Sequence, residues 1–172
     1  MDFDPAPRAV TEPDFRSLFA AMPVPLLVLA PDFTIVCVND AYLAATRTER
    51  AAIVGRDVFE GFPDNPGDPS ATGAANLRAS VERVLRTREP DTMALQKYDI
   101  RIASPGGVAF EERYWSAVNT PVLGADGAVT HILQRVEDVT EFCHSLAREA
   151  NMASRLGAQA LEVEQANRRL RD

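Results

Sequence analysis

The spacing of hydrophobic side chains changes period near the end of the sequence. From Val129 to Val136 apolar and polar residues alternate, which is typical of a half-buried strand. From Asp138 onward the apolar residues recur at helical spacing, and no turn residue separates the two patterns. The sequence therefore predicts a strand that runs directly into a long helix. Asp138 is expected to cap this helix, and Glu141 to reach back to the cap as in a capping box.

The predicted C-terminal helix, residues 139–172, carries the apolar stripe of a coiled coil. With Val139 at heptad position a, the a and d positions are mostly apolar for over four heptads, and Glu149 is the weak point. Asn167 falls at an a position, where a buried amide fixes the register of two strands. The stripe predicts a parallel homodimer, although packing of its first turns against the sheet is an alternative. The side chains expected at the dimer interface are Phe142, Leu146, Leu156, Val163, Asn167 and Leu170.

A second apolar stripe lies near the N-terminus. Asp14 is expected to cap a short amphipathic helix that presents Phe15 and Phe19, and two prolines end it. Because neither stripe has an obvious partner within the chain, Phe15 and Phe19 are also assigned to the dimer interface. Two β-rich runs follow, residues 26–30 and 34–39, and the turn signal between them predicts a hairpin. The first run is uniformly apolar, which favours an interior place in the sheet.

The middle of the chain has the pattern of an α+β fold. A loop rich in Gly and Pro, residues 61–73, precedes an amphipathic helix whose apolar stripe includes Leu77, Val81 and Val84. Two turn signals, Ser-Pro-Gly-Gly and Gly-Ala-Asp-Gly, then separate three β-rich runs. With the first hairpin, these runs predict a five-stranded antiparallel sheet with helices on one face. The expected elements are helices at 39–46, 48–55 and 74–89 and strands at 92–102, 108–119 and 128–137.

The composition indicates how many domains the chain can form and which kinds of partner it favours. The 172 residues suffice for one domain and an appendage. The 18 basic and 25 acidic residues give a net charge of −7, which repels a phosphate backbone and argues against nucleic-acid binding. The tail 1–13 lacks the features of a signal peptide and is expected to be disordered, and the longest apolar run is too short for a membrane helix. Two distant cysteines, Cys37 and Cys143, fit a reducing cytoplasm.

The sequence shows no catalytic constellation, so the chain is not expected to be an enzyme on its own. It lacks a Gly-rich phosphate loop and the common hydrolase motifs. His144 lies beside Cys143, where helical side chains point about 100° apart and are poorly placed to share a metal ion. His144 is interpreted as a surface residue, because the residues around it do not form the phosphate-acceptor box of a sensor kinase. Any kinase is expected beyond Asp172, where the helix has no terminating residue.

The order of elements, together with three short strings, resembles a PAS domain. The strings are Gly-Arg-Asp-Val-Phe at 55–59, Asn-Thr-Pro-Val-Leu-Gly-Ala-Asp-Gly-Ala-Val at 119–129 and Glu-Asp-Val-Thr-Glu at 137–141. The last string is similar to the Asp-x-Thr signature at which PAS domains leave the sheet and enter an output helix. The alternative is that it merely caps a terminal helix.

The resemblance implies both a domain organisation and a role. Residues 14–138 would form the PAS domain with an N-terminal cap helix, followed by the coiled-coil signalling helix. Asp138, Thr140 and Glu141 would transmit a signal between the two. The resemblance implies the sensor module of a bacterial signalling protein, with a histidine kinase as the output in the same polypeptide. A ligand-free dimerisation adaptor is the alternative function.

Resemblance to the flavin-binding branch of PAS domains indicates which faces of the last two predicted strands point inward. Alternate residues there face the ligand, and the set that this resemblance places inward is Trp115, Ala117, Asn119, Ile132, Gln134 and Val136. This set is mostly apolar with two amides, as in a pocket for a small organic molecule. The motif that bonds flavin is absent, and the helix at 74–89 has no histidine for haem. The cofactor is therefore unknown, and a dry core without a ligand is the alternative.

Overall fold

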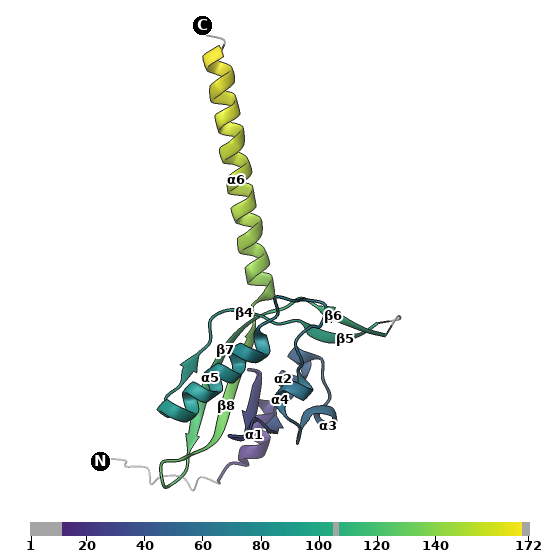
Figure 1. Ribbon diagram of the computed structural model, residues 1–172, viewed down its shortest axis with the longest axis vertical. Coiled ribbons are helices and arrows are strands. Elements are labelled where there is room, and N and C mark those ends of the chain that lie inside the picture. Colours follow the sequence, from purple (N-terminus) through teal and green to yellow (C-terminus); the bar gives the residue numbers. More distant parts are fainter. Residues whose placement is uncertain (1–11, 105–106, 170–172) are drawn as a thin grey trace, which may run out of the picture.

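The structure is a computed structural model that describes residues 12–104 and 107–169, with the backbone alone for residues 103–104 and 163–169. Most of the predicted tail 1–13 therefore lies outside the described residues. Figure 1 shows a head of strands and helices from which one long helix projects. The fold is of the α+β class as expected, and helices and strands follow one another in the predicted order. The segment 108–119, expected to form one strand, is instead divided between β6 (Gly107–Glu111) and β7 (Tyr114–Leu123), which belong to different sheets.

One antiparallel sheet organises the head. Its strand order is β2-β1-β8-β7-β3, and the short strand β4 also pairs with β7. The uniformly apolar strand β1 lies between β2 and β8, so its predicted interior place is confirmed. The strands of this sheet are β1 (Leu26–Leu29), β2 (Ile35–Val38), β3 (Asp91–Thr92), β4 (Gln96–Lys97), β7 (Tyr114–Leu123) and β8 (Val129–Asp138).

The segment expected to form one strand, residues 92–102, is instead broken into β3, β4 and β5 (Ile100–Ser104). Met93 and Ile100 are both buried, yet they are an odd number of residues apart. In a continuous strand they would face opposite sides of the sheet. The break lets both side chains turn into the core, and β5 then pairs with β6 (Gly107–Glu111) in a separate two-stranded sheet.

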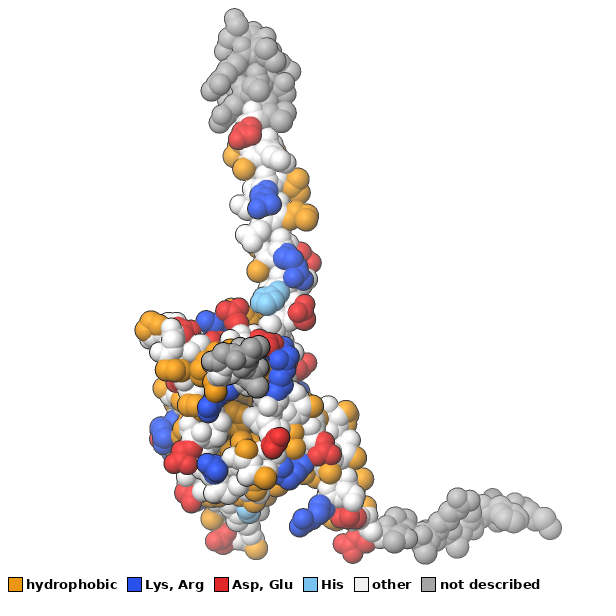
Figure 2. Space-filling view, turned by 90° about the vertical axis from the view of Figure 1, so that its right-hand side faces the viewer, with side chains coloured by type: hydrophobic (Ala, Val, Ile, Leu, Met, Phe, Trp, Pro, Cys, Tyr) orange, Lys and Arg blue, Asp and Glu red, His pale blue; other side chains and the backbone are white. Residues whose placement is uncertain are grey.

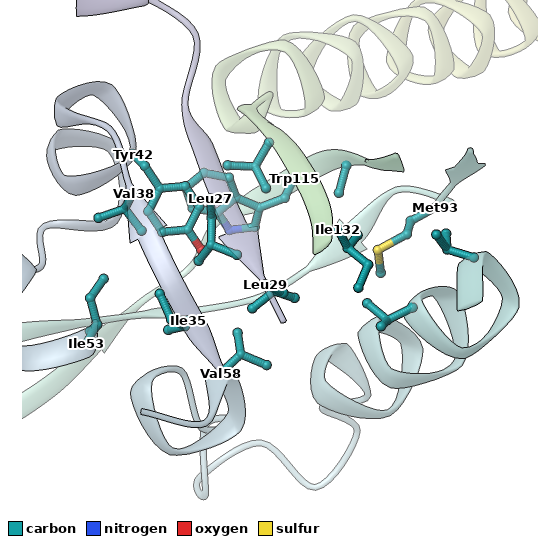
Figure 3. Close-up of a cluster of buried hydrophobic side chains, with 14 of the residues drawn as sticks. Leu27, Leu29, Ile35, Val38, Tyr42, Ile53, Val58, Met93, Trp115 and Ile132 are labelled. Carbon is teal, nitrogen blue, oxygen red and sulfur yellow. The ribbon is translucent and has the colours of Figure 1, made fainter. Parts of the chain in front are cut away.

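The helices of the head gather on one face of the sheet (Figure 1). The amphipathic helix α5 buries Val81 and Val84 against the sheet, as its apolar stripe predicts. Figure 3 shows the core that results, with side chains of β1, β2, β7 and β8 meeting those of the helices. The helices of the head are α1 (Phe15–Ala21), α2 (Asp40–Thr46), α3 (Arg50–Ile53), α4 (Val58–Gly61) and α5 (Gly73–Thr87).

Asn39 fixes the start of α2 to the start of β1. Its Oδ1 accepts hydrogen bonds from the backbone N of Tyr42 and of Leu26, both at 2.9 Å. Its Nδ2 donates to the carbonyl oxygen of Val24 at 2.8 Å and to that of Met22 at 3.2 Å. The side chain is fully buried and fully bonded, so this N-terminal cap of α2 also serves as a tertiary link.

The long helix α6 (Thr140–Arg169) begins one residue after the predicted start at residue 139. Asp138 is the last residue of β8 and is paired with Trp115 of β7, so the sheet ladder rather than the helix holds its backbone. Only Val139 separates β8 from α6. Asp138 Oδ1 accepts from the backbone N of Thr140 in the first turn of α6, as its predicted capping role requires. The return bond from Glu141 that would complete a capping box is not found among the described residues. Of the helices that the structure describes, none is long and apolar enough to cross a membrane.

Candidate functional site: a small cavity and the strand-to-helix junction

A cavity of about 80 Å³ lies between the sheet and the helices. Its walls come from α2, α4, α5, the broken strand segment, β7 and β8, and Figure 3 labels Tyr42, Val58, Met93 and Trp115 among them. None of the lining side chains carries a charge. The lining residues are Tyr42, Thr46, Val58, Phe59, Phe62, Gly73, Ala74, Leu77, Met93, Gln96, Tyr98, Ile100, Trp115, Gln134 and Val136.

The six side chains predicted to face inward are all buried. Trp115, Gln134 and Val136 line the cavity, whereas the other three, Ala117, Asn119 and Ile132, are buried beside it and do not. Asn119 Nδ2 donates to Ser80 Oγ at 2.7 Å, which ties β7 to α5. The strand orientation taken from the resemblance therefore agrees with the structure, and the binding role of these residues stays a prediction.

Tyr98 forms one wall of the cavity and is held from three sides. Its hydroxyl donates to the carbonyl oxygen of Phe62, and its own carbonyl oxygen accepts from Trp115 Nε1 at 2.8 Å. Its ring lies directly over Gly73, where a Cβ would stand 2.0 Å from Tyr98 Cδ2. Burial raises the pKa of both Tyr98 and Tyr42 above the usual range, so both phenols stay neutral.

The lining residues do not fit the two cofactors common in PAS domains. They include neither a cysteine that could bond a flavin nor a histidine that could ligate haem iron. The volume of about 80 Å³ is also far below the roughly 300 to 1,000 Å³ of pockets for larger ligands. Among the described residues, no group of three or more His, Cys, Asp or Glu side chains is placed to hold a metal ion.

A second cluster of polar residues joins β8 to α6. Asp138 Oδ1 accepts from the backbone N of Thr140 at 3.0 Å and from its Oγ1 at 2.5 Å. Asp138 Oδ2 accepts from Arg113 Nη1 at 2.9 Å. Partial burial opposes ionisation of Asp138, but the hydrogen bonds from Thr140 and the Arg113 guanidinium outweigh it and lower the pKa of this carboxyl.

The first turn of α6 is also bonded to the start of β7. The backbone N of Tyr114 donates to Thr140 Oγ1 at 2.9 Å, and the backbone N of Val139 donates to the carbonyl oxygen of Tyr114 at 2.9 Å. Asp138 and Thr140 therefore occupy the junction as predicted. No hydrogen bond of the Glu141 side chain is found in residues 12–104 and 107–169, and its predicted role in transmission stays untested.

The match of the sequence to known families agrees with this architecture. A family model described as the PAS fold matches residues 19–143, which is well over half of the chain. This chain belongs to the PAS family. A search of curated proteins gave no significant match to it.

Solved structures with the same fold include PAS domains from two bacteria. The PAS domain of Bordetella pertussis BvgS has a TM-score of 0.56 and 22% identity, with 81% of this chain and 94% of that chain covered. A PAS domain from Colwellia psychrerythraea has a TM-score of 0.53 and 15% identity, covering 74% and 95%. An RNA-binding light-oxygen-voltage receptor reaches 0.58 at 21% identity, covering 84% and 37%. At these identities the likeness concerns the fold alone.

Several apolar side chains of this PAS domain face solvent. Phe142 and Leu156 of α6 are 63% and 60% exposed, and Phe15 of α1 is 67% exposed. Leu146 is also exposed and Phe19 is half-buried. Figure 2 shows hydrophobic side chains along the projecting helix. The remaining residues predicted for the interface, Val163, Asn167 and Leu170, lie outside the described side chains.

The ligand-binding residues predicted from the sequence all lie on the last two strands, so the prediction did not name the side chains that the helices and the broken strand contribute to the cavity. Tyr42 lies in the seven-residue helix α2 and Phe62 directly follows the four-residue helix α4, and elements this short show no clear hydrophobic period. Tyr98 lies in the run that was expected to be one straight strand. The resemblance oriented only the last two strands, so it could find only the residues on that side of the cavity.

Proposed function

We propose that this PAS domain is a sensory and dimerisation module, which passes a change in its cavity or sheet through α6 to an output domain in the same polypeptide. The output that we propose is a histidine kinase in a bacterial two-component system. The chain itself would have no catalytic activity and would act in the cytoplasm. Its net charge of −7 favours neither nucleic acid nor an anionic membrane surface as a partner.

The observation that carries this proposal is the continuity from the cavity to α6. Gln134 and Val136 line the cavity, and Asp138 follows on the same side of β8 by the alternation of a strand. A single residue later the helix begins, and its first turn is bonded to both β7 and β8. A small shift of β8 therefore moves the base of α6, and coupling on the order of 1 to 3 kcal/mol suffices for regulation.

Dimerisation is supported by the exposed stripe of α6. Phe142, Leu146 and Leu156 fall at a or d positions of one heptad register and are at least half exposed in the single chain. A second copy of α6 alongside the first would bury them. The output helices of two protomers would then rotate or separate together.

A ligand-free dimerisation adaptor is the second candidate, because the exposed stripe favours it equally. The two candidates differ in whether output activity should depend on the helical phase of α6. Each residue inserted after Ala147 rotates everything downstream by about 100°, and seven residues restore the heptad register. The signalling proposal predicts that output activity of the full-length protein varies periodically with insertions of zero to seven residues. Output activity that does not change with insertion length would rule out transmission through β8 and α6 and leave the adaptor.

A further inference from the structure

The hairpin β5–β6 projects from the head near the base of α6 (Figure 1). It continues the ladder of β7, since Gln96 pairs with Trp115 in β7. Four residues further along each strand, Ile100 pairs with Glu111 in β6, so the register does not change. On its other side β7 pairs with β8, but that ladder ends at Asp138, where the chain leaves the sheet for α6. Among the residues that the structure describes, no strand lies beside β6 where β8 would have continued.

The free edge of β6 presents backbone groups that another strand could bond. The backbone N of Tyr98 donates to the carbonyl oxygen of Arg113 at 2.9 Å, so these opposite residues form a hydrogen-bonded pair. In an antiparallel ladder such pairs alternate with pairs whose backbone groups point outward. By this alternation Val108 and Phe110 fall at outward positions. In the part of the chain that the structure describes, no hydrogen bond from outside the hairpin reaches either backbone.

This edge also lacks the features that normally keep strands of different molecules apart. Natural proteins protect exposed edges with charged residues, prolines or bulges. From Gly107 to Phe110 β6 has neither a charged residue nor a proline, and its ladder with β5 is regular. Val108 is 62% exposed, on the same face of the hairpin as Phe110. β5 differs, because the charged side chains of Arg56 and Arg101 line a groove beside it.

We propose that β6 pairs antiparallel with β6 of a second copy of this chain, which joins two hairpins into one four-stranded sheet. With Ala109 at the centre, Val108 of each chain lies opposite Phe110 of the other, and such β-branched and aromatic pairs are favourable. Gly107 lies opposite Glu111, so no like charges meet. The edge is therefore self-complementary, as a contact with twofold symmetry requires.

This contact is separate from the coiled coil of α6. The backbone N of Val139 donates to the carbonyl oxygen of Tyr114, so Tyr114 marks the base of α6. Five positions separate Ala109 from Tyr114 in each chain, which places the two bases roughly 30 Å apart at about 3.3 Å per residue. Packed helices lie only about 10 Å apart. The inference therefore goes beyond the proposed function, and a chain that uses both contacts forms assemblies larger than a dimer.

The test traps the contact as a disulfide, because two short strands bury far less than about 1,200 Å² and bind weakly. Ala109 would lie opposite its own copy at a pair without hydrogen bonds, with Cα atoms about 4.5 Å apart, which suits a disulfide. Ala109→Cys is made together with Cys37→Ala and Cys143→Ala, which remove the two native thiols. Leu156→Asp is added so that α6 does not bring the hairpins together. With diamide as the oxidant, disulfide dimers should form at least about tenfold faster than in the matched chain that carries Arg101→Cys on β5 instead.

A further substitution asks whether the contact runs along β6. Val108→Lys should lower the trapping rate of Ala109→Cys to that of the Arg101→Cys control, because a charge on the edge opposes pairing. Val108 is mostly exposed, so an unchanged thermal midpoint should show that the fold is kept. Equal rates for Ala109→Cys and Arg101→Cys would overturn the inference, since they would mean chance collision. A rate that Val108→Lys leaves unchanged would overturn it as well. Because every variant carries Leu156→Asp, neither result bears on the α6 contact or on the proposed function.

Discussion

Arg113 and Asp138 form an ion pair, with Nη1 and Oδ2 2.9 Å apart. Arg113 directly precedes β7 and Asp138 ends β8, so the pair lies at the base of the output helix α6. Arg113 also pairs with Glu111, whose other oxygen pairs with Arg47 Nη1 at 2.8 Å. Arg47 is the C-terminal cap of α2, the helix that supplies Tyr42 to the cavity. Alternating charges therefore connect a cavity-lining helix to the base of α6 by a route that reaches β8 only at its last residue, Asp138.

Replacing Arg113 should destabilise the domain and weaken its coupling to α6. Arg113→Gln leaves the carboxylates of Glu111 and Asp138 without their shared cation, and the Arg113 side chain is only 20% exposed. We expect a loss of about 1 to 2 kcal/mol in the free energy of unfolding, measured by urea denaturation. Arg135→Gln is the control, because Arg135 pairs with Glu137 at 3.7 Å between largely exposed groups. It should change stability by less than about 0.5 kcal/mol, and equal losses in both variants would contradict a special role for Arg113.

The Asp138 carboxyl should contribute a pH-dependent part of the stability. Its pKa is lower in the folded protein than its ordinary value of 3.8, so the folded state favours the ionised form. The stabilisation is present above the unfolded pKa and is lost as the pH falls through the folded pKa. Asp138→Asn should therefore be less stable than the original protein at neutral pH, and the difference should shrink below about pH 4. Urea denaturation of both proteins at a series of pH values measures this difference, and a constant difference down to low pH would show that ionisation of Asp138 plays no part.

Gly73 should not tolerate even a methyl group. Because a Cβ there would stand 2.0 Å from Tyr98 Cδ2, Gly73→Ala must displace the Tyr98 ring that walls the cavity. We expect a loss of about 1 to 3 kcal/mol in the free energy of unfolding, together with altered Trp115 fluorescence. Gly157→Ala is the matched control in α6, where no atom lies within 4 Å of the added Cβ. It should stabilise the helix by up to about 1 kcal/mol. Wild-type stability of Gly73→Ala would show that the ring moves freely.

The sequence predicted what depends on local period and missed what depends on distant residues. Alternation along residues 129–136 grouped Ile132, Gln134 and Val136 on one face, because a strand face is set by neighbours two residues apart, and the resemblance to the flavin-binding PAS branch identified that face as the buried one. The cap rule located Asp138 but not the helix start, since the pairing of Asp138 with Trp115 extends the ladder to that residue.

The charge network could not be predicted from any pattern in the sequence. Arg47 and Glu111 are 64 positions apart, and Arg113 and Asp138 are 25 apart. Each is a charged residue on a segment that could have faced solvent, and only the fold brings the four together. The cavity could not be predicted from a sequence pattern either, because one of its walls depends on the packing of the Tyr98 ring against Gly73, 25 positions away.

The exposed stripe of α6 should hold two chains together. Leu156→Asp places a charge at a d position and should weaken the homodimer, whereas Ala158→Asp adds the same charge at an f position and should leave it intact. Sedimentation of the three proteins at tens of micromolar measures the dissociation constant, and we expect the first variant to raise it by at least about tenfold. The comparison holds net charge constant, so general repulsion cannot account for a difference. A monomeric original protein, or equal weakening by both variants, would place the dimer contacts elsewhere and remove the support that α6 gives to the proposed function.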